Sequence, residues 1–391
     1  MHQIMNMETK NYLVSLLTAW AQNADTEKPV ALPVPPGVDT LVVCDTILNH
    51  HVHVALAPFI PEEVQTLELR ENLASARERT AFLLLELERI LPSVTWEACR
   101  PVVLKGAALA PGFYAQPDQR WFLDLDILVP RGLVDEVCHR LEGLGYHAYS
   151  ANRDPLYYDR HHLHRMMVGP QGSCVEVHWD LTLPASIYQF DLPGVFNRAN
   201  ALVLGRETML TAAPVDQILH GVYQHIADGF LDLKRVMDMS LLLKKLSEDE
   251  ILYLVKESRR TKMNLALGLS LHLVKAFCGV SLPNGILNNL KPGWATNRIL
   301  HGLNVESAML ERKAEKVDGF ASLVHFLMVP SGGEKMRESS RFIWGGEAEL
   351  MDRGHWHNEM PGFSQRMRLS LYLLKTLLNL GGRATKALVH G

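Results

Sequence analysis

The first quarter of the chain carries apolar residues at helical spacing. They recur in residues 11–21 and again in a long charged segment from 62 to 91, which is the pattern of amphipathic helices. Prolines within residues 28–38 predict an extended link between the two, because proline fixes the backbone and blocks helical hydrogen bonds. Pro92 is expected to end the second helix. The pattern therefore predicts a mostly helical region over residues 1–95.

The pattern changes to short runs and strict alternation between about residues 96 and 210. Apolar residues alternate with acidic ones over 123–129 and again over 173–181, as in strands with one buried face. The other elements expected here are a buried strand at 102–104, a turn entering a helix at 106–113, and an amphipathic helix at 134–144 capped by Gly145. This middle region therefore predicts a sheet with helices packed on it.

From residue 211 to the end the helical period returns. The expected helices are 214–227, 230–246, 248–260 and 263–278, with loops at 329–334 and 344–346. The apolar stretch 369–380 has polar residues at helical spacing, which favours a packed terminal helix over attachment to a membrane surface. The whole pattern predicts an α+β protein with three regions, 1–95, 96–210 and 211–391.

Composition narrows the class of protein. The chain has 391 residues, of which 47% are hydrophobic and 21% charged, so it is globular rather than disordered. A net charge of -4 gives no global basic field that would recruit nucleic acid. The five cysteines are scattered without a CxxC pair, which argues against a disulfide-linked partner and suits a reducing cytoplasm. No targeting segment and no membrane-spanning run is visible.

Two carboxylates share one strand face in the middle region. Asp124 and Asp126 stand at i and i+2, so they point the same way roughly 6.6 Å apart. Acidic residues in an apolar strand are costly unless a cation relieves them, and hard oxygen ligands suit Mg²⁺ or Mn²⁺. Glu176, on the second alternating strand, offers a third carboxylate. Three such groups on neighbouring strands can hold two metal ions roughly 3.5–4 Å apart.

A strand-to-helix turn precedes this pair. Gly106 would let backbone N–H groups approach a phosphate at the start of a helix, and Lys105 beside it would supply a mobile cation. A single glycine after a strand is commonly only a turn. This turn is a candidate for phosphate binding because it lies just upstream of Asp124 and Asp126.

These motifs together resemble a known family. They are Val103 to Leu109 with its Lys-Gly-Ala-Ala, Arg120 through Asp124-Leu125-Asp126 to Val129, Leu144-Gly145-Tyr146, and Glu176-Val177-His178-Trp179. In this order they are similar to the DNA polymerase β-like nucleotidyltransferase superfamily, and more narrowly to the poorly characterised bacterial nucleotidyltransferases often labelled NTP_transf_5. The resemblance implies a polymerase β-like core, a small mixed sheet with helices, flanked by helical regions on both sides.

The resemblance also implies roles for individual residues. Asp124, Asp126 and Glu176 would bind two Mg²⁺ ions and an NTP, and Gly106 with its neighbours Lys105 and Ala107 would contact the triphosphate. Ala107 stands where the superfamily usually has serine, so a hydroxyl contact to phosphate is absent.

Several other polar residues have more than one interpretation. Arg120 is placed to neutralise phosphate or brace the carboxylates, or else forms a surface ion pair. His178 shares the face of Glu176, so it orients a carboxylate, meets the substrate or is a core histidine. Trp179 points the other way, into the core. Arg235 and Asp238 share a helix face and are either a surface pair or part of the site.

Two histidine clusters and two basic runs complete the candidates. The clusters at 50–53 and 161–164 have no accompanying cysteine, so metal binding is the less favoured interpretation of each. The resemblance puts His162 or His164 near the nucleotide. The basic runs at 244–245 and 259–262 are expected to be solvated faces rather than a groove for nucleic acid.

Three hypotheses of different classes follow. The first is a metal-dependent nucleotidyltransferase that transfers NMP from an NTP to an unidentified acceptor (small molecule, protein or RNA) and releases pyrophosphate. The second is a binding module that grips a nucleotide or partner without chemistry. The third is a helical partner protein in which the acid pair is incidental. Nucleotide binding that ignores Mg²⁺ would favour the second, and no response to Mn²⁺ would favour the third.

Overall fold

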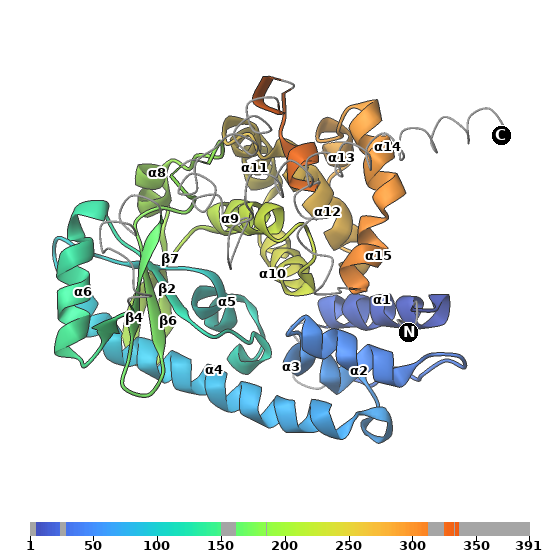
Figure 1. Ribbon diagram of the computed structural model, residues 1–391, viewed down its shortest axis with the longest axis horizontal. Coiled ribbons are helices and arrows are strands. Elements are labelled where there is room, and N and C mark those ends of the chain that lie inside the picture. Colours follow the sequence, from blue (N-terminus) through green and yellow to red (C-terminus); the bar gives the residue numbers. More distant parts are fainter. Residues whose placement is uncertain are drawn as a thin grey trace, which may run out of the picture.

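The computed structural model describes residues 5–23, 29–149, 162–184, 186–311, 324–331 and 333–335 (Figure 1). The expected helix at 369–380, the loop at 344–346 and His161 lie outside these residues. The mixed α+β fold expected from the sequence is confirmed.

The segments with alternating apolar residues lie in a mixed sheet, which has seven strands among the described residues. The strand order in this sheet is β3-β4-β5-β2-β1-β7-β6. Its strands are β1 (Val102–Val103), β2 (Leu125–Leu128), β3 (His147–Ala148), β4 (His164–Val168), β5 (Cys174–His178), β6 (Asn200–Leu204) and β7 (Glu207–Thr211). The pairs β2–β5 and β1–β7 are parallel, whereas the other neighbours are antiparallel.

Helices precede, interrupt and follow the sheet. They are α1 (Met7–Gln22), α2 (Thr40–Asn49), α3 (His53–Leu56), α4 (Leu67–Val94), α5 (Lys105–Phe113), α6 (Val134–Gly143), α8 (Leu192–Asn197), α9 (Pro214–Ala227), α10 (Leu233–Lys244), α11 (Glu248–Arg260), α12 (Asn264–Cys278), α13 (Ile286–Asn289), α14 (Trp294–Leu303) and α15 (Val305–Leu310). Figure 1 shows α4 running beneath the sheet and on beneath α2 and α3.

Helix α4 differs from its expected bounds at both ends. Residues Glu62–Val64 form a separate 3-10 turn, and α4 begins after Thr66, whose side chain accepts a hydrogen bond from the Leu69 N–H. The helix runs past Pro92, so the expectation that this proline ends it was wrong. Proline removes one backbone hydrogen bond, and the buried side chains of Leu91 and Val94 hold the last turn against the sheet.

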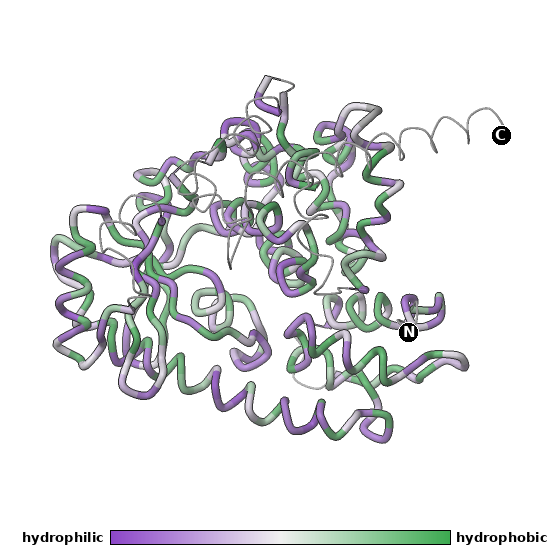
Figure 2. Tube along the Cα trace, in the orientation of Figure 1, coloured by the Kyte–Doolittle hydropathy of each residue, from purple (hydrophilic) through white to green (hydrophobic). Residues whose placement is uncertain are grey.

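Besides a small hydrophobic cluster around Val102, Leu128 and Val195, two larger hydrophobic cores divide the buried apolar residues. One joins the C-terminal half of α4 to α5, α6 and the inner residues of the strands. The other joins α1 and α2 to the helices from α9 onwards. Figure 1 accordingly shows α1 beside α12 and α15, far along the chain. Figure 2 shows hydrophilic and hydrophobic residues recurring together along α4, in keeping with its amphipathic pattern.

The three expected strands, β1, β2 and β5, begin and end inside their expected ranges, whereas β3, β4, β6 and β7 were not predicted. Strand β2 starts at Leu125, because Leu123 is 53% exposed and does not join the buried face. Strand β5 spans 174–178 within the expected 173–181. Helices α9 and α11 match the expected bounds, and α10 starts at Leu233 where Asp232 accepts a hydrogen bond from the Lys234 N–H. No helix among the described residues combines the length and apolar character needed to cross a bilayer.

Candidate functional site

The three carboxylates singled out in the sequence come together at one edge of β2 and β5. Asp126 and Glu176 are direct neighbours in the parallel register of these strands, so their side chains share a face. Asp124 lies just before β2 rather than on it. Each of the three offers an oxygen within 4.8 Å of the others. An all-oxygen set of this kind fits Mg²⁺ or Mn²⁺.

Lys105, the first residue of α5, faces these carboxylates. Its ammonium Nζ lies 2.5 Å from Oδ1 of Asp126 and 3.5 Å from Oε2 of Glu176. Its backbone has φ of 49°, in the left-handed region that non-glycine residues rarely adopt. A strained backbone at a functional turn is held by its surroundings. The ammonium of Lys105 therefore already places one positive charge beside Asp126 and Glu176.

Gly106 has a packing role that the sequence did not reveal. A Cβ atom at this position would lie 2.5 Å from Cβ of Phe122, closer than atoms can pack. The side chains of Ala107 and Ala108 are fully buried in the core beneath α5. The glycine thus lets the first turn of α5 approach the chain that leads into β2, which brings the helix N-terminus beside Asp124.

His178 connects two of the carboxylates. Its buried Nε2 lies 2.8 Å from Oδ1 of Asp126 and 3.1 Å from Oε2 of Glu176. His164, on the antiparallel neighbour β4, places its Nε2 3.6 Å from the other oxygen of Glu176. Trp179 lies in the core on the sheet side, as expected. His178 is therefore part of the carboxylate cluster and not an isolated core histidine.

The pKa values of the cluster reflect burial, the crowding of carboxylates and their hydrogen bonds to His178. Burial, and then the charge of Asp126, raises the pKa of Asp124 to about 6. Burial would raise the pKa of Glu176 as well, but the hydrogen bond from His178 and the charge of Lys105 hold it well below its usual range. Burial opposes the charged form of His178, yet its hydrogen bonds to Asp126 and Glu176 raise its pKa. The site thus carries concentrated negative charge at neutral pH.

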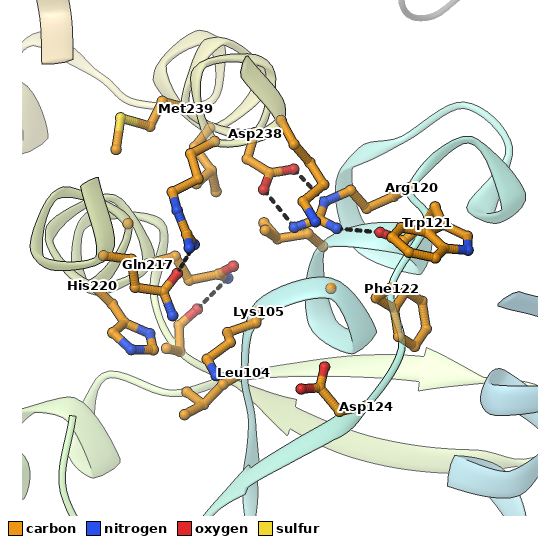
Figure 3. Close-up of a pocket in the computed structure, with 18 of the residues that line it drawn as sticks. Leu104, Lys105, Arg120, Trp121, Phe122, Asp124, Gln217, His220, Asp238 and Met239 are labelled. Carbon is orange, nitrogen blue, oxygen red and sulfur yellow. Dashed lines mark hydrogen bonds and ion pairs between the residues drawn. The ribbon is translucent and has the colours of Figure 1, made fainter. Parts of the chain in front are cut away.

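A cavity of about 290 Å³ opens beside this cluster. Figure 3 shows Lys105 and Asp124 on its sheet side, with Gln217 and His220 reaching in from α9 and Asp238 and Met239 from α10. Lys234 and Arg235 of α10 also line it. Sequence reasoning did not identify Gln217, His220 or Lys234, because they lie on helices remote in sequence from the acidic motif.

Arg120 holds α10 against the segment that leads into β2. Its Nε and Nη2 donate to the two carboxylate oxygens of Asp238 at 2.7 and 2.8 Å, and Tyr114 donates its hydroxyl to the same carboxylate. Arg120 is only 5% exposed, so the interpretation as a surface pair was wrong. Its guanidinium faces Asp238 and not the three carboxylates, because α10 supplies a buried bidentate partner.

Lys234 and Arg235, which are neighbours on α10, have different interaction partners. Arg235 pairs with Asp228 and, at 3.6 Å, with Asp232, not with Asp238 three positions on. Lys234 has its Nζ 5.6 Å from the ring centre of Trp121. Burial and the charge of Arg120 lower the pKa of Lys234 to about 8. Both cations line the cavity that adjoins the carboxylates.

A second cavity, of about 550 Å³, shares His51 and Trp121 with the first. Its other lining residues come from α2, α3 and α4. Within the described residues, neither ring nitrogen of His53 has a hydrogen-bond partner, although this lining residue is 4% exposed. None of the histidines at 50, 51 and 53 belongs to a donor group able to hold a metal in the described part of the chain.

The mixed sheet, the acidic pair at its edge and the helix that starts at Lys105 define a nucleotidyltransferase-like core. Residues 46–279 match the model of a protein family described as an uncharacterised nucleotidyltransferase. The match spans more than half of the chain, and the chain belongs to this family, as its motifs suggested. A comparison with curated proteins finds no match.

Proposed function

We propose that the protein is a metal-dependent nucleotidyltransferase, which moves NMP from an NTP to an acceptor and releases pyrophosphate. The observation that carries this proposal is the convergence of Asp124, Asp126 and Glu176 within 4.8 Å of one another beside a cavity lined with cations. Family membership supports the reaction class.

The carboxylates would hold Mg²⁺, with Mn²⁺ as an alternative, through the oxygens that now face Lys105. Bound there, the ion supplies charge neutralisation at the phosphates and lowers the cost of deprotonating an attacking hydroxyl. The hydrogen bonds from His178 fix the orientation of Asp126 and Glu176 before any ion binds. Such preorganisation reduces the rearrangement needed during the reaction.

The NTP would lie in the 290 Å³ cavity with its phosphates toward the start of α5. Backbone N–H groups in the first turn of that nine-residue helix favour negative charge. Lys105, Lys234 and Arg235 converge on the same space from two elements. These groups bind and orient the phosphates, which is most of what phosphoryl transfer asks of a protein.

The acceptor would enter from the 550 Å³ cavity on the side of the N-terminal helices. This cavity meets the first at Trp121, three residues before Asp124. Among the described residues that line it, Glu68 is the sole charged side chain apart from histidines, so the cavity suits an uncharged or cationic hydroxyl compound. Asn72→Leu, which removes one polar lining residue, should reduce acceptor labelling and leave NTP binding unchanged.

The proposal is tested by incubating the full chain with each α-labelled NTP, Mg²⁺ and a cell extract, followed by identification of what becomes labelled. Asp124→Asn and Asp126→Asn should abolish labelling, as should EDTA. Asp118→Asn is the matched control, because this carboxylate pairs with Arg77 and lines neither cavity. Unchanged labelling in an Asp124→Ala protein would refute the proposed nucleotidyltransferase activity.

A non-catalytic binding module is the alternative, and the observation in its favour is Ala107, whose side chain is buried and offers no hydroxyl to a phosphate. Nucleotide affinity, measured calorimetrically with and without Mg²⁺, separates the two. The enzyme requires affinity to depend on the ion, whereas a module that grips only through Lys105, Lys234 and Arg235 binds equally well in EDTA.

A further inference from the structure

Two histidines and a glutamate form a mixed nitrogen and oxygen cluster on strands β4 and β5. His164 and His178 are direct partners in the antiparallel register, so their side chains lie on the same face. Glu176 is two residues before His178 and therefore shares that face. The ring centres of the two histidines lie 4.8 Å apart. The sheet thus fixes three donor groups at one place.

The distances within this cluster match ligands around one ion. Nε2 of His164 is 3.6 Å from one oxygen of Glu176, and Nε2 of His178 is 3.1 Å from the other. The longer distance exceeds that of a hydrogen bond. Ligands bound at about 2.0–2.1 Å in a tetrahedral shell stand roughly 3.3–3.4 Å apart. Each residue offers one donor atom within 4.8 Å of the other two.

We propose that His164, Glu176 and His178 form a second cation site, which takes an ion that prefers imidazole ligands, of the Zn²⁺ class. This site is distinct in chemistry from the all-carboxylate set, since nitrogen ligands disfavour Mg²⁺ and favour Zn²⁺ and Co²⁺. The inference does not depend on nucleotidyl transfer, because it concerns binding alone.

The charge of the cluster stays balanced when a cation replaces the proton on Nε2 of His178. Nε2 of His178 now lies within hydrogen-bond distance of Asp126 and Glu176, so the proton it donates must leave when the ion binds. The ion then replaces that proton as the positive partner of Glu176. Oδ1 of Asp126, 2.8 Å from Nε2 of His178, stands beside the vacated position. Asp126 keeps the ammonium of Lys105 as its cationic neighbour.

Glu176 belongs to both donor groups, which couples the two sites. An ion held by the histidines draws the Glu176 oxygens away from the carboxylate set and adds positive charge beside it. We expect Zn²⁺ to raise the Mg²⁺ concentration needed at the carboxylate site.

The test uses the full chain titrated with Co²⁺ in metal-free buffer. Four-coordinate Co²⁺ with imidazole ligands gives strong visible absorption bands, and Zn²⁺ should displace them. His164→Gln should weaken Co²⁺ binding at least about tenfold. His139→Gln, an exposed histidine on α6, is the matched control and should bind Co²⁺ as the unmodified protein does. Unfolding temperatures of both variants check that the fold is retained.

Asp124→Asn separates this inference from the proposed function. It removes a carboxylate of the Mg²⁺ set and none of the three proposed ligands, so its Co²⁺ bands should persist while its response to Mg²⁺ is lost. Absence of bands in the unmodified protein overturns the site, and so do unchanged bands in His164→Gln. Neither outcome bears on whether the protein transfers nucleotides.

Discussion

The ammonium of Lys105 lies 2.5 Å from Oδ1 of Asp126, so the chain itself supplies a cation to its acidic cluster. Lys105→Met removes that charge from beside Asp126 and Glu176, which keep their hydrogen bonds to His178. We expect the variant to lose about 1–3 kcal/mol of unfolding free energy without divalent ions. Mg²⁺ should restore more stability to it than to the unmodified protein, as measured by thermal unfolding in EDTA and in Mg²⁺.

Lys10→Met is the matched control for that comparison. Lys10 pairs with Glu311 at 2.6 Å and is about as exposed as Lys105, at 18% against 25% of its side chain. Its loss should destabilise the protein to a similar or smaller degree, with no added response to Mg²⁺. If Lys105→Met is as stable as the unmodified protein in EDTA, the carboxylates do not need its charge.

The raised pKa of Asp124 makes a prediction about pH. Its pKa is about 6 in the folded protein, against 3.8 for an ordinary aspartate, because of burial and the charge of Asp126. The folded state therefore holds the proton more tightly, and this group lowers the free energy of unfolding as pH rises from about 4 to 6. Asp124→Asn should be more stable than the unmodified protein by about 1–3 kcal/mol at pH 7.5 in EDTA.

The gain should shrink as the pH falls toward 4, where the aspartate is protonated in the folded state, and disappear below it. Denaturant unfolding of both proteins across this range measures it. Asp118→Asn serves as the control and should show no such pH-dependent gain. A variant that is less stable than the unmodified protein at pH 7.5 would contradict the crowding of negative charge at Asp124.

Local signals explain which elements the sequence predicted well. Helix α9 begins at Pro214 and α11 at a capping box between Ser247 and Glu250, and such signals are readable in a few residues. The hairpin of β6 and β7 was missed. Its place in the sheet depends on parallel pairing with β1, about a hundred residues earlier, and no local pattern encodes such a partner.

In the candidate site, too, some features could be predicted from local sequence and others could not. The spacing of Asp124 and Asp126 was enough to expect two carboxylates on one face, because strand geometry fixes which residues share a face. That Glu176 joins them depends on the parallel pairing of β2 with β5, and this was expected from the resemblance to the family. The partners of Arg120 and the contributions of His220 and Lys234 depend on how α9 and α10 dock. Helical periodicity indicates which face of a helix is buried, but not which residue that face meets.

Gly106 should be sensitive to the smallest substitution. In Gly106→Ala the new Cβ would lie 2.5 Å from Cβ of Phe122, so α5 or the segment before β2 must move. We expect a loss of about 1–3 kcal/mol in unfolding free energy and weaker NTP binding. Gly143→Ala at the end of α6 meets nothing within 4 Å and should be neutral or stabilising by up to about 1 kcal/mol.

Shortening Phe122 should not rescue Gly106→Ala, because the nearest atom is the Cβ that every residue except glycine carries. The double variant Gly106→Ala with Phe122→Ala should therefore be no more stable than Gly106→Ala alone in urea unfolding. Full recovery in the double variant would mean that the ring of Phe122, and not the backbone approach, requires the glycine.

The buried pair of Arg120 and Asp238 should control the position of α10 and so the affinity for nucleotide. Arg120→Met leaves the buried Asp238 carboxylate with the Tyr114 hydroxyl as its one remaining hydrogen-bond partner among the described residues, which should cost about 3–5 kcal/mol of unfolding free energy. Combining it with Asp238→Leu removes the stranded charge and should recover most of that loss in denaturant unfolding. Because α10 also carries Lys234 and Arg235, the double variant should still bind NTP more weakly than the unmodified protein. Equal NTP affinity in a stable double variant would show that the ion pair holds the fold without positioning the cavity.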